Sequence, residues 1–395
     1  MYEVEKNCFE FCSSSYNAHI LSIFSYHFNG ENMKKVVIIG LMIILLIPFS
    51  VSAIETSARS AILMDTDSNR IMYAKNIDEV RSVASISKIM TGILACESGK
   101  LDDTIVIGDE ILDAYGSAIY IKVGEKIKLR DLVYGLMLRS GNDAALAIAK
   151  YVGGDVDNFV KLMNEKAKKI GMKNTIFNNP SGLDENGGNL STAYDMAILM
   201  SYAVKNVEFK TIVGTKKHSV KTNMNVYSWT NKNKLLGSYK YATGGKTGYT
   251  EIAKRTLVTT ASKDNLNLVV VTLNDGNDFS DHKSLHEYGF NTYDSYNILQ
   301  KGNINIYDDN YYKKGELYIN NGYAYPLLDK EKEMIRLKFE IERKDDVQDG
   351  DKVGIVKIYF ADKELYKDDV YFGEIKSSKK LGFFDSIWKW IKNLW

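Results

Sequence analysis

Two residues that could do chemistry together, Ser85 and Lys88, lie three positions apart at the start of an apolar run from Ile89 to Leu94. The run predicts a helix beginning near Ser85. Side chains three residues apart on a helix share one face, with Cβ atoms about 5–6 Å apart, so the lysine amine can reach the serine hydroxyl. A serine is a weak nucleophile unless a base takes its proton, and a partly desolvated lysine with a lowered pKa can be that base. Because Ser-x-x-Lys occurs in many proteins, the pair needs further residues before it identifies a site.

Two further short motifs supply such residues. They are Ser140-Gly141-Asn142 and Lys246-Thr247-Gly248. The first interrupts a helical pattern of apolar residues, and the second stands where the chain changes to strand-like residues. Each triplet is common by itself. In this order, after Ser-x-x-Lys, they indicate a serine acyl-transfer site.

Around these motifs the sequence resembles the serine penicillin-binding proteins and β-lactamases, and among them the low-molecular-weight D-alanyl-D-alanine carboxypeptidases of the peptidase S11 type. The stretches that carry the resemblance are residues 84–91, 138–145, 179–184, 191–195 and 245–250. The resemblance is firm over residues 55–295 and looser beyond. It implies an α+β fold, with a five-stranded antiparallel sheet packed between helices and a small C-terminal all-β domain.

The resemblance also implies an activity, the removal of the terminal D-alanine from peptidoglycan stem pentapeptides, with β-lactam antibiotics as covalent inhibitors and no cofactor or metal. Ser85 would attack the carbonyl between the two D-alanines, with Lys88 as the base. The resemblance implies that Ser140 relays a proton and that Asn142 hydrogen-bonds the substrate and Lys88. It implies that Lys246 and Thr247 bind the substrate carboxylate and that Gly248 lets the strand backbone approach closely. The N–H groups of Ser85 and Tyr249 would form the oxyanion hole.

The sequence departs from the family pattern in two ways. Relatives usually carry a glycine near the position of Lys254. An additional arginine that helps to hold the substrate carboxylate has no evident counterpart, although His282 is nearby in sequence. Both departures concern substrate affinity more than the chemistry.

Two other functions remain open. A class A-like β-lactamase needs a loop glutamate that activates the deacylating water, and Glu185 with Asn189 has a similar spacing. These residues stand in an Asn- and Gly-rich stretch, which favours an ordinary loop. The second alternative is a non-catalytic scaffold that binds the cell wall, although every catalytic residue type is present.

The elements that must position these residues follow from apolar spacing and turn residues. We expect strands at 58–64, 70–74, 104–107, 118–123, 255–261 and 266–273, and helices starting near 85, 129 and 144, at 156–170 and 192–204, and around 285–288. Beyond residue 303 the pattern turns β-rich, with strands at 316–319, 335–341 and 352–360. The predicted domains are a peptidase domain at 54–295 and a β-rich domain at 296–375.

The chain ends predict export and membrane association. Residues 33–53 form a secretory signal, with a basic start, a short apolar core and small residues before a cleavage point after Ala53. Residues 1–32 are either a leader or an over-called start of the reading frame. Residues 376–395 predict an amphipathic helix, aromatic on one face, that lies in a membrane interface. The expected location is the extracellular face of the cytoplasmic membrane.

Composition limits the other classes of partner. Lys and Arg total 51 against 50 Asp and Glu, so a bulk basic surface for nucleic acid is absent. Only 3 cysteines and 5 scattered histidines occur, which speaks against a metal site.

Overall fold

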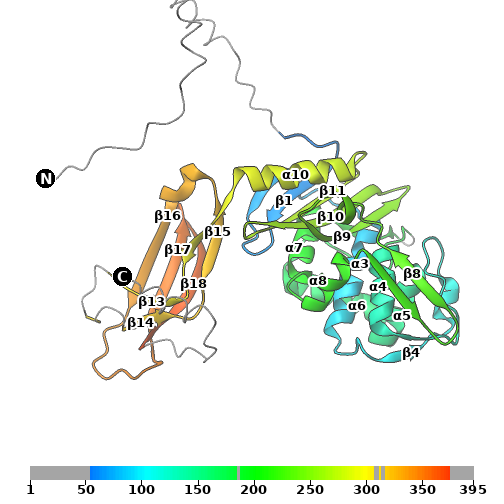
Figure 1. Ribbon diagram of the computed structural model, residues 1–395, viewed down its shortest axis with the longest axis horizontal. Helices are drawn as coiled ribbons and strands as arrows, with labels where there is room; N and C mark the ends of the chain where they lie inside the picture. Colours follow the sequence, from blue (N-terminus) through cyan, green and yellow to red (C-terminus); the bar gives the residue numbers. More distant parts are fainter. Residues whose placement is uncertain (1–53, 185–186, 307–310, 313–315, 374–395) are drawn as a thin grey trace, which may run out of the picture. The chain divides into compact units, whose positions relative to one another are not determined.

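A five-stranded antiparallel sheet organises the larger part of the chain (Figure 1). The computed structural model describes residues 54–184, 187–306, 311–312 and 316–373. In spatial order the strands are β2 (Ile71–Lys75), β1 (Ser60–Asp65), β11 (Leu266–Leu273), β10 (Lys254–Lys263) and β9 (Ala242–Thr250). Strand β9 therefore lies at one edge of the sheet, where a bound peptide could add to it.

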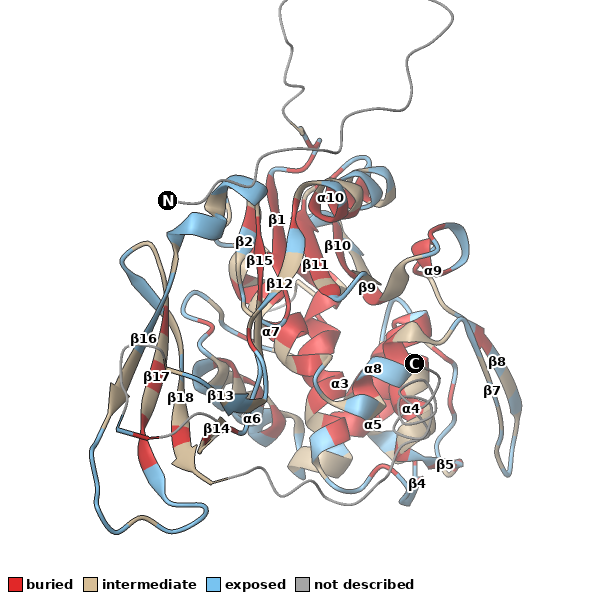
Figure 2. Cartoon of the chain, turned by 60° about the vertical axis from the view of Figure 1, so that its left-hand side comes forward, coloured by how far each residue is buried: buried red, intermediate tan, exposed pale blue. Residues whose placement is uncertain are grey.

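Helices cover both faces of this sheet, and the alternation of side chains along β1 shows how. Ile62 and Met64 pack into a core shared with the helices that follow β3 (Arg81–Ser82) in sequence. Leu63, between them, packs in a second core with Leu285 of α10 (Asp278–Thr292). The central strands and α3 are consequently the most buried elements (Figure 2).

The helical part between β3 and β9 contributes most of the larger core. Its helices are α3 (Lys88–Glu97), α4 (Leu129–Arg139), α5 (Asn142–Gly153), α6 (Val156–Ile170), α7 (Ala193–Ala203), α8 (Val207–Gly214) and the short α9 (Leu235–Ser238). Local signals set their ends. The Asp155 side chain accepts a hydrogen bond from Asn158 N at the start of α6, and Gly171 adopts a left-handed φ of 89° at its end.

Short paired strands complete this part: β3 with β6 (Leu190–Ser191), β4 (Thr104–Val106) with β5 (Lys126–Lys128), and β7 (Lys217–Lys221) with β8 (Val226–Thr230). The strand predicted at 118–123 is wrong, because those residues form a loop. The backbone N–H groups of Ile119, Tyr120 and Ile121 all donate to the carboxylate of Asp143. A buried side chain thus satisfies the donors that a neighbouring strand would otherwise have paired.

The C-terminal region is β-rich, as predicted. β12 (Asp294–Leu299) pairs with β15 (Tyr323–Leu327), and a second five-stranded sheet has the order β13 (Gly302–Ile304), β14 (Leu317–Ile319), β18 (Lys363–Phe372), β17 (Lys352–Phe360) and β16 (Ile335–Ile341). Its core is small and includes Ile319, Val356 and Val370. The domain boundaries of the sequence analysis stay predictions.

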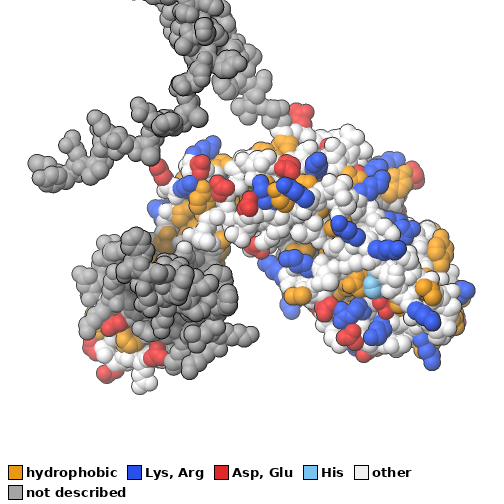
Figure 3. All heavy atoms as spheres, in the orientation of Figure 1, with side chains coloured by type: hydrophobic (Ala, Val, Ile, Leu, Met, Phe, Trp, Pro, Cys, Tyr) orange, Lys and Arg blue, Asp and Glu red, His pale blue; other side chains and the backbone are white. Residues whose placement is uncertain are grey.

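The predicted signal at 33–53 and the predicted anchor helix at 376–395 lie outside the described residues. Within the described ranges, no helix is long and apolar enough to span a bilayer. Lys and Arg side chains are spread over the peptidase part of the chain on the face drawn in Figure 3.

Candidate active site

Ser85 lies in a tight turn and not in the first turn of an α-helix. The turn is the 3-10 helix Ala84–Ser87, and α3 begins at Lys88, so the predicted helix start was three residues too early. In a 3-10 turn, side chains at positions i and i+3 lie above one another. Lys88 Nζ is 3.0 Å from Ser85 Oγ. The turn opens with Ala84 at a φ of 51°, a strained conformation for alanine of the kind found at functional sites.

Lys88 is completely buried among hydrogen-bond acceptors. Its Nζ donates to Asn142 Oδ1 at 2.7 Å and to the carbonyl oxygen of Ser181. Burial, with a further contribution from the positive charge of Lys232, lowers the pKa of Lys88 to about 7, although Asp143 acts in the opposite direction. A large share of the amine is therefore neutral at pH 7, as a general base requires.

The Ser-x-Asn motif forms the junction of α4 and α5. Ser140 ends α4 with a left-handed φ of 67°, and Asn142 starts α5. The Asn142 side chain bridges two parts of the site, since its Nδ2 donates to the Tyr115 carbonyl oxygen at 2.6 Å while its Oδ1 accepts from Lys88. Ser140 is buried, but among the described residues its hydroxyl bonds to neither Ser85 nor Lys88.

Strand β9 brings the Lys-Thr-Gly motif against the nucleophile turn. A Cβ atom at Gly248 would lie 2.4 Å from Thr256 Oγ1 and 3.0 Å from the backbone nitrogen of Ser85, so only glycine permits this approach. Lys246 is buried, and its Nζ donates to the Thr247 carbonyl oxygen at 2.6 Å. Burial and then the charges of Lys88 and Lys232 hold the pKa of Lys246 well below its ordinary value.

Tyr249 follows on the same strand and pairs with Arg255 of β10. Its side chain is exposed, and its hydroxyl donates to Glu251 at 2.7 Å. The structure thus brings Ser85, Lys88, Asn142, Lys246 and Gly248 together. Ser140 lies at the same helix junction as Asn142, and Thr247 and Tyr249 lie beside Gly248 on β9.

A supporting loop contributes a partner that the sequence analysis did not find, the carbonyl oxygen of Ser181. Asn189 holds this loop, because its side chain accepts from the N–H groups of Asn178 and Asn179 and donates to the Asn179 carbonyl oxygen. A Cβ atom at Gly182 would lie 2.1 Å from the Ala84 carbonyl oxygen. The stretch 179–184 had marked the family resemblance, but nothing in it indicated a contact with Lys88. Glu185 lies outside the described residues.

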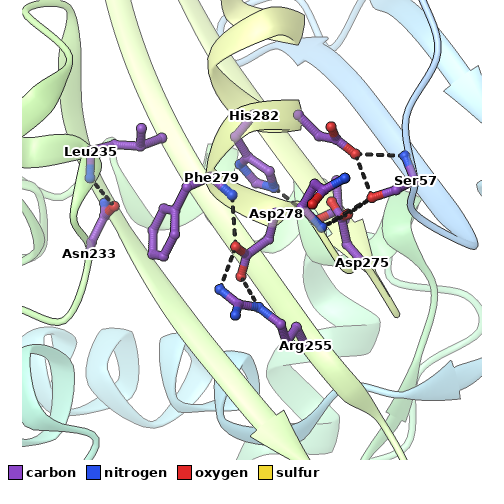
Figure 4. Close-up of polar contacts among 11 residues, drawn as sticks. Ser57, Asn233, Leu235, Arg255, Asp275, Asp278, Phe279 and His282 are labelled. Carbon is purple, nitrogen blue, oxygen red and sulfur yellow. Dashed lines mark hydrogen bonds and ion pairs between the residues drawn. The ribbon is translucent and has the colours of Figure 1, made fainter.

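A second missed stretch, residues 231–235, connects the two sides of the site. The backbone N–H of Lys232 donates to the Leu138 carbonyl oxygen at 3.1 Å, and Asn233 Nδ2 donates to the Gly244 carbonyl oxygen at 3.1 Å. Asn233 Oδ1 also accepts from Leu235 N (Figure 4). This stretch places Lys232 close enough to Lys88 and Lys246 for its charge to lower the pKa of both lysines. No motif in the sequence singled it out.

The two departures noted in the sequence have clear structural positions. Lys254 adopts a left-handed φ of 57°, which explains why glycine suits this place in relatives. His282 of α10 is fully buried (Figure 4). Its ring nitrogens bond to Thr259 at 2.7 Å and Thr272 at 3.0 Å, so it is not a counterpart of the missing arginine. Burial keeps the pKa of His282 well below its ordinary value.

Arg255 lies on β10, the strand next to the Lys-Thr-Gly motif. Two of its nitrogens bind the Asp278 carboxylate at 2.7 and 3.0 Å (Figure 4). A bidentate pair of this kind is among the stronger charge-assisted contacts.

The described residues contain no cluster of His, Cys, Asp and Glu suited to a metal ion.

The solved structures that resemble this chain are penicillin-binding proteins and D-alanyl-D-alanine peptidases, which share its sheet-and-helix fold. The sequence pattern of the D-alanyl-D-alanine carboxypeptidases, peptidase S11, matches residues 47–277. The chain belongs to this family.

Individual relatives agree with that assignment. The D-alanyl-D-alanine carboxypeptidase DacF of Bacillus subtilis is 30% identical over 377 residues, which cover 89% of this chain and 96% of DacF. DacC of Escherichia coli is 33% identical over 264 residues, covering 62% of this chain and 64% of DacC. Penicillin binding protein 5 from Haemophilus influenzae has a TM-score of 0.67 at 26% identity, covering 82% of this chain and 99% of that structure.

Proposed function

We propose that this protein removes the terminal D-alanine from peptidoglycan stem peptides through an acyl-enzyme on Ser85. The observation that carries the proposal is the 3.0 Å distance between Lys88 Nζ and Ser85 Oγ, with a Lys88 pKa of about 7. A serine hydroxyl beside a neutral, desolvated amine can give its proton to that amine, which makes the serine oxygen the activated nucleophile that acyl transfer needs. The membership of the chain in the S11 family supports the same reaction.

In the acylation step, Ser85 Oγ attacks the carbonyl carbon between the two D-alanines and its proton passes to Lys88 Nζ. The carbonyl oxygen becomes an oxyanion, which the backbone N–H groups of Ser85 and Tyr249 would stabilise. When the C–N bond breaks, the proton held by Lys88 passes to the leaving amine, with Ser140 as the proposed relay, so that Lys88 is neutral again and D-alanine departs. Asn142 keeps Lys88 in place through its 2.7 Å hydrogen bond.

In the deacylation step, water attacks the ester carbonyl and gives a proton to Lys88. The ester bond to Ser85 Oγ breaks, the serine recovers its proton, and the shortened stem peptide leaves. A β-lactam would acylate Ser85 by the same attack, because its ring amide occupies the place of the scissile peptide. Slow release of that adduct distinguishes a carboxypeptidase from a β-lactamase.

The cellular setting is part of this proposal. The signal at 33–53 supports export, and the aromatic and basic residues of 376–395 support attachment to the outer face of the cytoplasmic membrane. At that place the protein meets peptidoglycan stem peptides, its proposed substrate.

The test uses the exported chain, residues 54–395, incubated with a pentapeptide that ends in D-Ala-D-Ala. Mass analysis should detect release of one D-alanine, and labelled penicillin should form a lasting adduct. Ser85→Ala should abolish both while the circular dichroism spectrum stays unchanged. Unchanged release by Ser85→Ala would refute the assignment, and rapid turnover of penicillin would favour the β-lactamase alternative.

A further inference from the structure

The side-chain amide of Asn142 can face Lys88 with its oxygen or with its nitrogen, and a backbone carbonyl decides between the two. Asn142 Oδ1 accepts from Lys88 Nζ at 2.7 Å, while Asn142 Nδ2 donates to the Tyr115 carbonyl oxygen at 2.6 Å. If the amide were turned over, Oδ1 would face the Tyr115 carbonyl oxygen, and two acceptors form no hydrogen bond. The Tyr115 carbonyl therefore keeps the amide oxygen turned toward the lysine.

Tyr115 belongs to the loop 114–125, which follows the 3-10 helix Asp109–Asp113 and meets the start of α5. The Ser117 carbonyl oxygen of this loop accepts from the backbone N–H of Asn142 at 2.7 Å. Gly116, between the two acceptors, has a φ of 79°, and a Cβ atom there would lie 3.3 Å from Asn142 Nδ2. The loop thus holds both the backbone and the side chain of Asn142 at close range.

The loop itself is held by Asp143, the residue that follows Asn142. The Asp143 carboxylate is buried and accepts from the backbone N–H groups of Ile119 at 3.0 Å, Tyr120 at 2.7 Å and Ile121 at 3.3 Å. Tyr120 has a φ of 65°, an unfavourable conformation for a residue with a side chain. Its side chain is 77% exposed, so burial of that ring does not offset the strain, whereas its bond to Asp143 can.

We propose that Asp143 is a positioning residue for the acylation step: by holding the loop 114–125, it keeps the Asn142 amide oxygen against Lys88. The proposal rests on the proposed function, in which Lys88 takes the proton of Ser85. Without the carboxylate, the N–H groups of residues 119–121 lose their buried acceptor and the loop must shift. The Tyr115 carbonyl then moves away from Asn142, and the amide that orients Lys88 is free to turn.

The experiment measures acylation of Ser85 by labelled penicillin in Asp143→Asn, which keeps the size of the side chain and one acceptor oxygen. We expect the maximal rate constant of acylation to fall about tenfold, the scale of one weakened hydrogen bond to a charged group. The penicillin concentration that gives half of this rate and the final fraction of labelled chains should not change. A merely structural role would instead lower the labelled fraction and the thermal midpoint of unfolding, while the folded chains react at the wild-type rate.

Gly116→Ala separates positioning from the charge of Asp143, because it leaves that charge in place and presses the loop against Asn142 Nδ2. Its acylation should also slow by about tenfold. The loss in the double variant with Asp143→Asn should be smaller than the product of the two single losses, since both changes act through Asn142. Gly124→Ala is the matched control. Gly124 has a similar φ of 81° in the same loop, but the nearest atom to its new Cβ is Met224 Cε at 3.5 Å.

Asp65→Asn is the control for a buried carboxylate elsewhere, since Asp65 is also buried and accepts from Ser68 N at 2.8 Å. This variant should acylate at the wild-type rate. The inference is overturned if folded Asp143→Asn keeps the wild-type rate, or if Gly116→Ala and Gly124→Ala react equally fast. The second comparison decides the matter even if Asp143→Asn does not fold. Failure of penicillin to label the wild type would refute the proposed function itself, which is a separate outcome.

Discussion

Lysines are used in opposite ways in the two parts of this chain. In the C-terminal sheet they lie at the surface with carboxylate partners, as Lys352 with Asp369 at 2.6 Å and Lys357 with Glu340 at 2.9 Å. Around Ser85, Lys88 and Lys246 are buried and without a carboxylate partner among the described residues. Hydrogen bonding to the partner raises the pKa of Lys352, whereas burial lowers the pKa of Lys88 to about 7.

The buried lysines mark the place where the fold tolerates an electrostatically unfavourable arrangement. A buried cation without a counter-charge is destabilising, and such groups concentrate at functional sites because their shifted pKa serves the chemistry. Exposed ion pairs contribute little to stability or to chemistry. Changes at Lys88, Gly248 and Lys352 test this contrast.

The largest effect should come from Lys88→Met. This change removes the proposed base and leaves a side chain of similar length, so the rate of Ser85 acylation by labelled penicillin should fall by about 10²–10⁴-fold. The variant should still fold, because a buried charge is removed from the core. A rate within threefold of the wild type would mean that another group takes the proton from Ser85.

The pH dependence of acylation should follow the lowered pKa of Lys88. The amine must be neutral to accept a proton, so the rate should rise with pH and level off above about 7. Folding stability should change in the same direction. Since the unfolded chain keeps its proton up to the ordinary pKa of 10.5, Lys88 makes the free energy of unfolding increase between about pH 7 and that value.

Urea unfolding of the wild type and Lys88→Met at several pH values isolates this contribution. As the pH rises from 7 to 10, the free energy of unfolding of the wild type should increase relative to that of Lys88→Met. A difference that stays constant over this range would contradict the lowered pKa.

Gly248→Ala should have the next largest effect, because the added methyl group meets Thr256 Oγ1 and the Ser85 backbone. Strand β9 must then move away from the nucleophile turn. We expect acylation to slow by about 10²-fold, the scale of a misplacement of about 1 Å at a reacting centre. Gly276→Ala is the control, since nothing lies within 4 Å of its new Cβ atom. Equal rates for the two variants would show that the close approach of β9 is not needed.

The smallest effect should come from Lys352→Gln in the C-terminal sheet. Its ion pair with Asp369 is exposed, and such pairs contribute little. Acylation of Ser85 and the thermal midpoint of unfolding should both stay within experimental error of the wild type. A loss of acylation would show that the two regions are coupled, which the contrast between them does not predict.

Much of the fold could be predicted because local rules dominate it. Helix α6 has the bounds expected for it, since Asp155 caps its start and Gly171 stops its end. Strand β11 also has its expected bounds, from the run of β-branched residues between two turns. The expected strand at 118–123 failed because a distant carboxylate, that of Asp143, takes the hydrogen bonds of its backbone. A long-range partner of this kind leaves no local pattern.

The site likewise has residues that the local sequence predicted and partners that only tertiary contacts supply. The residue types and order of Ser85, Lys88, Ser140, Asn142 and the Lys-Thr-Gly motif predicted the family to which the chain belongs, because these groups are rare in combination. The Ser181 carbonyl oxygen and Lys232 became visible only in the folded chain. A backbone carbonyl has no residue type to mark it, and a lysine is common everywhere. Their place beside Lys88 depends on loops that only tertiary packing brings together.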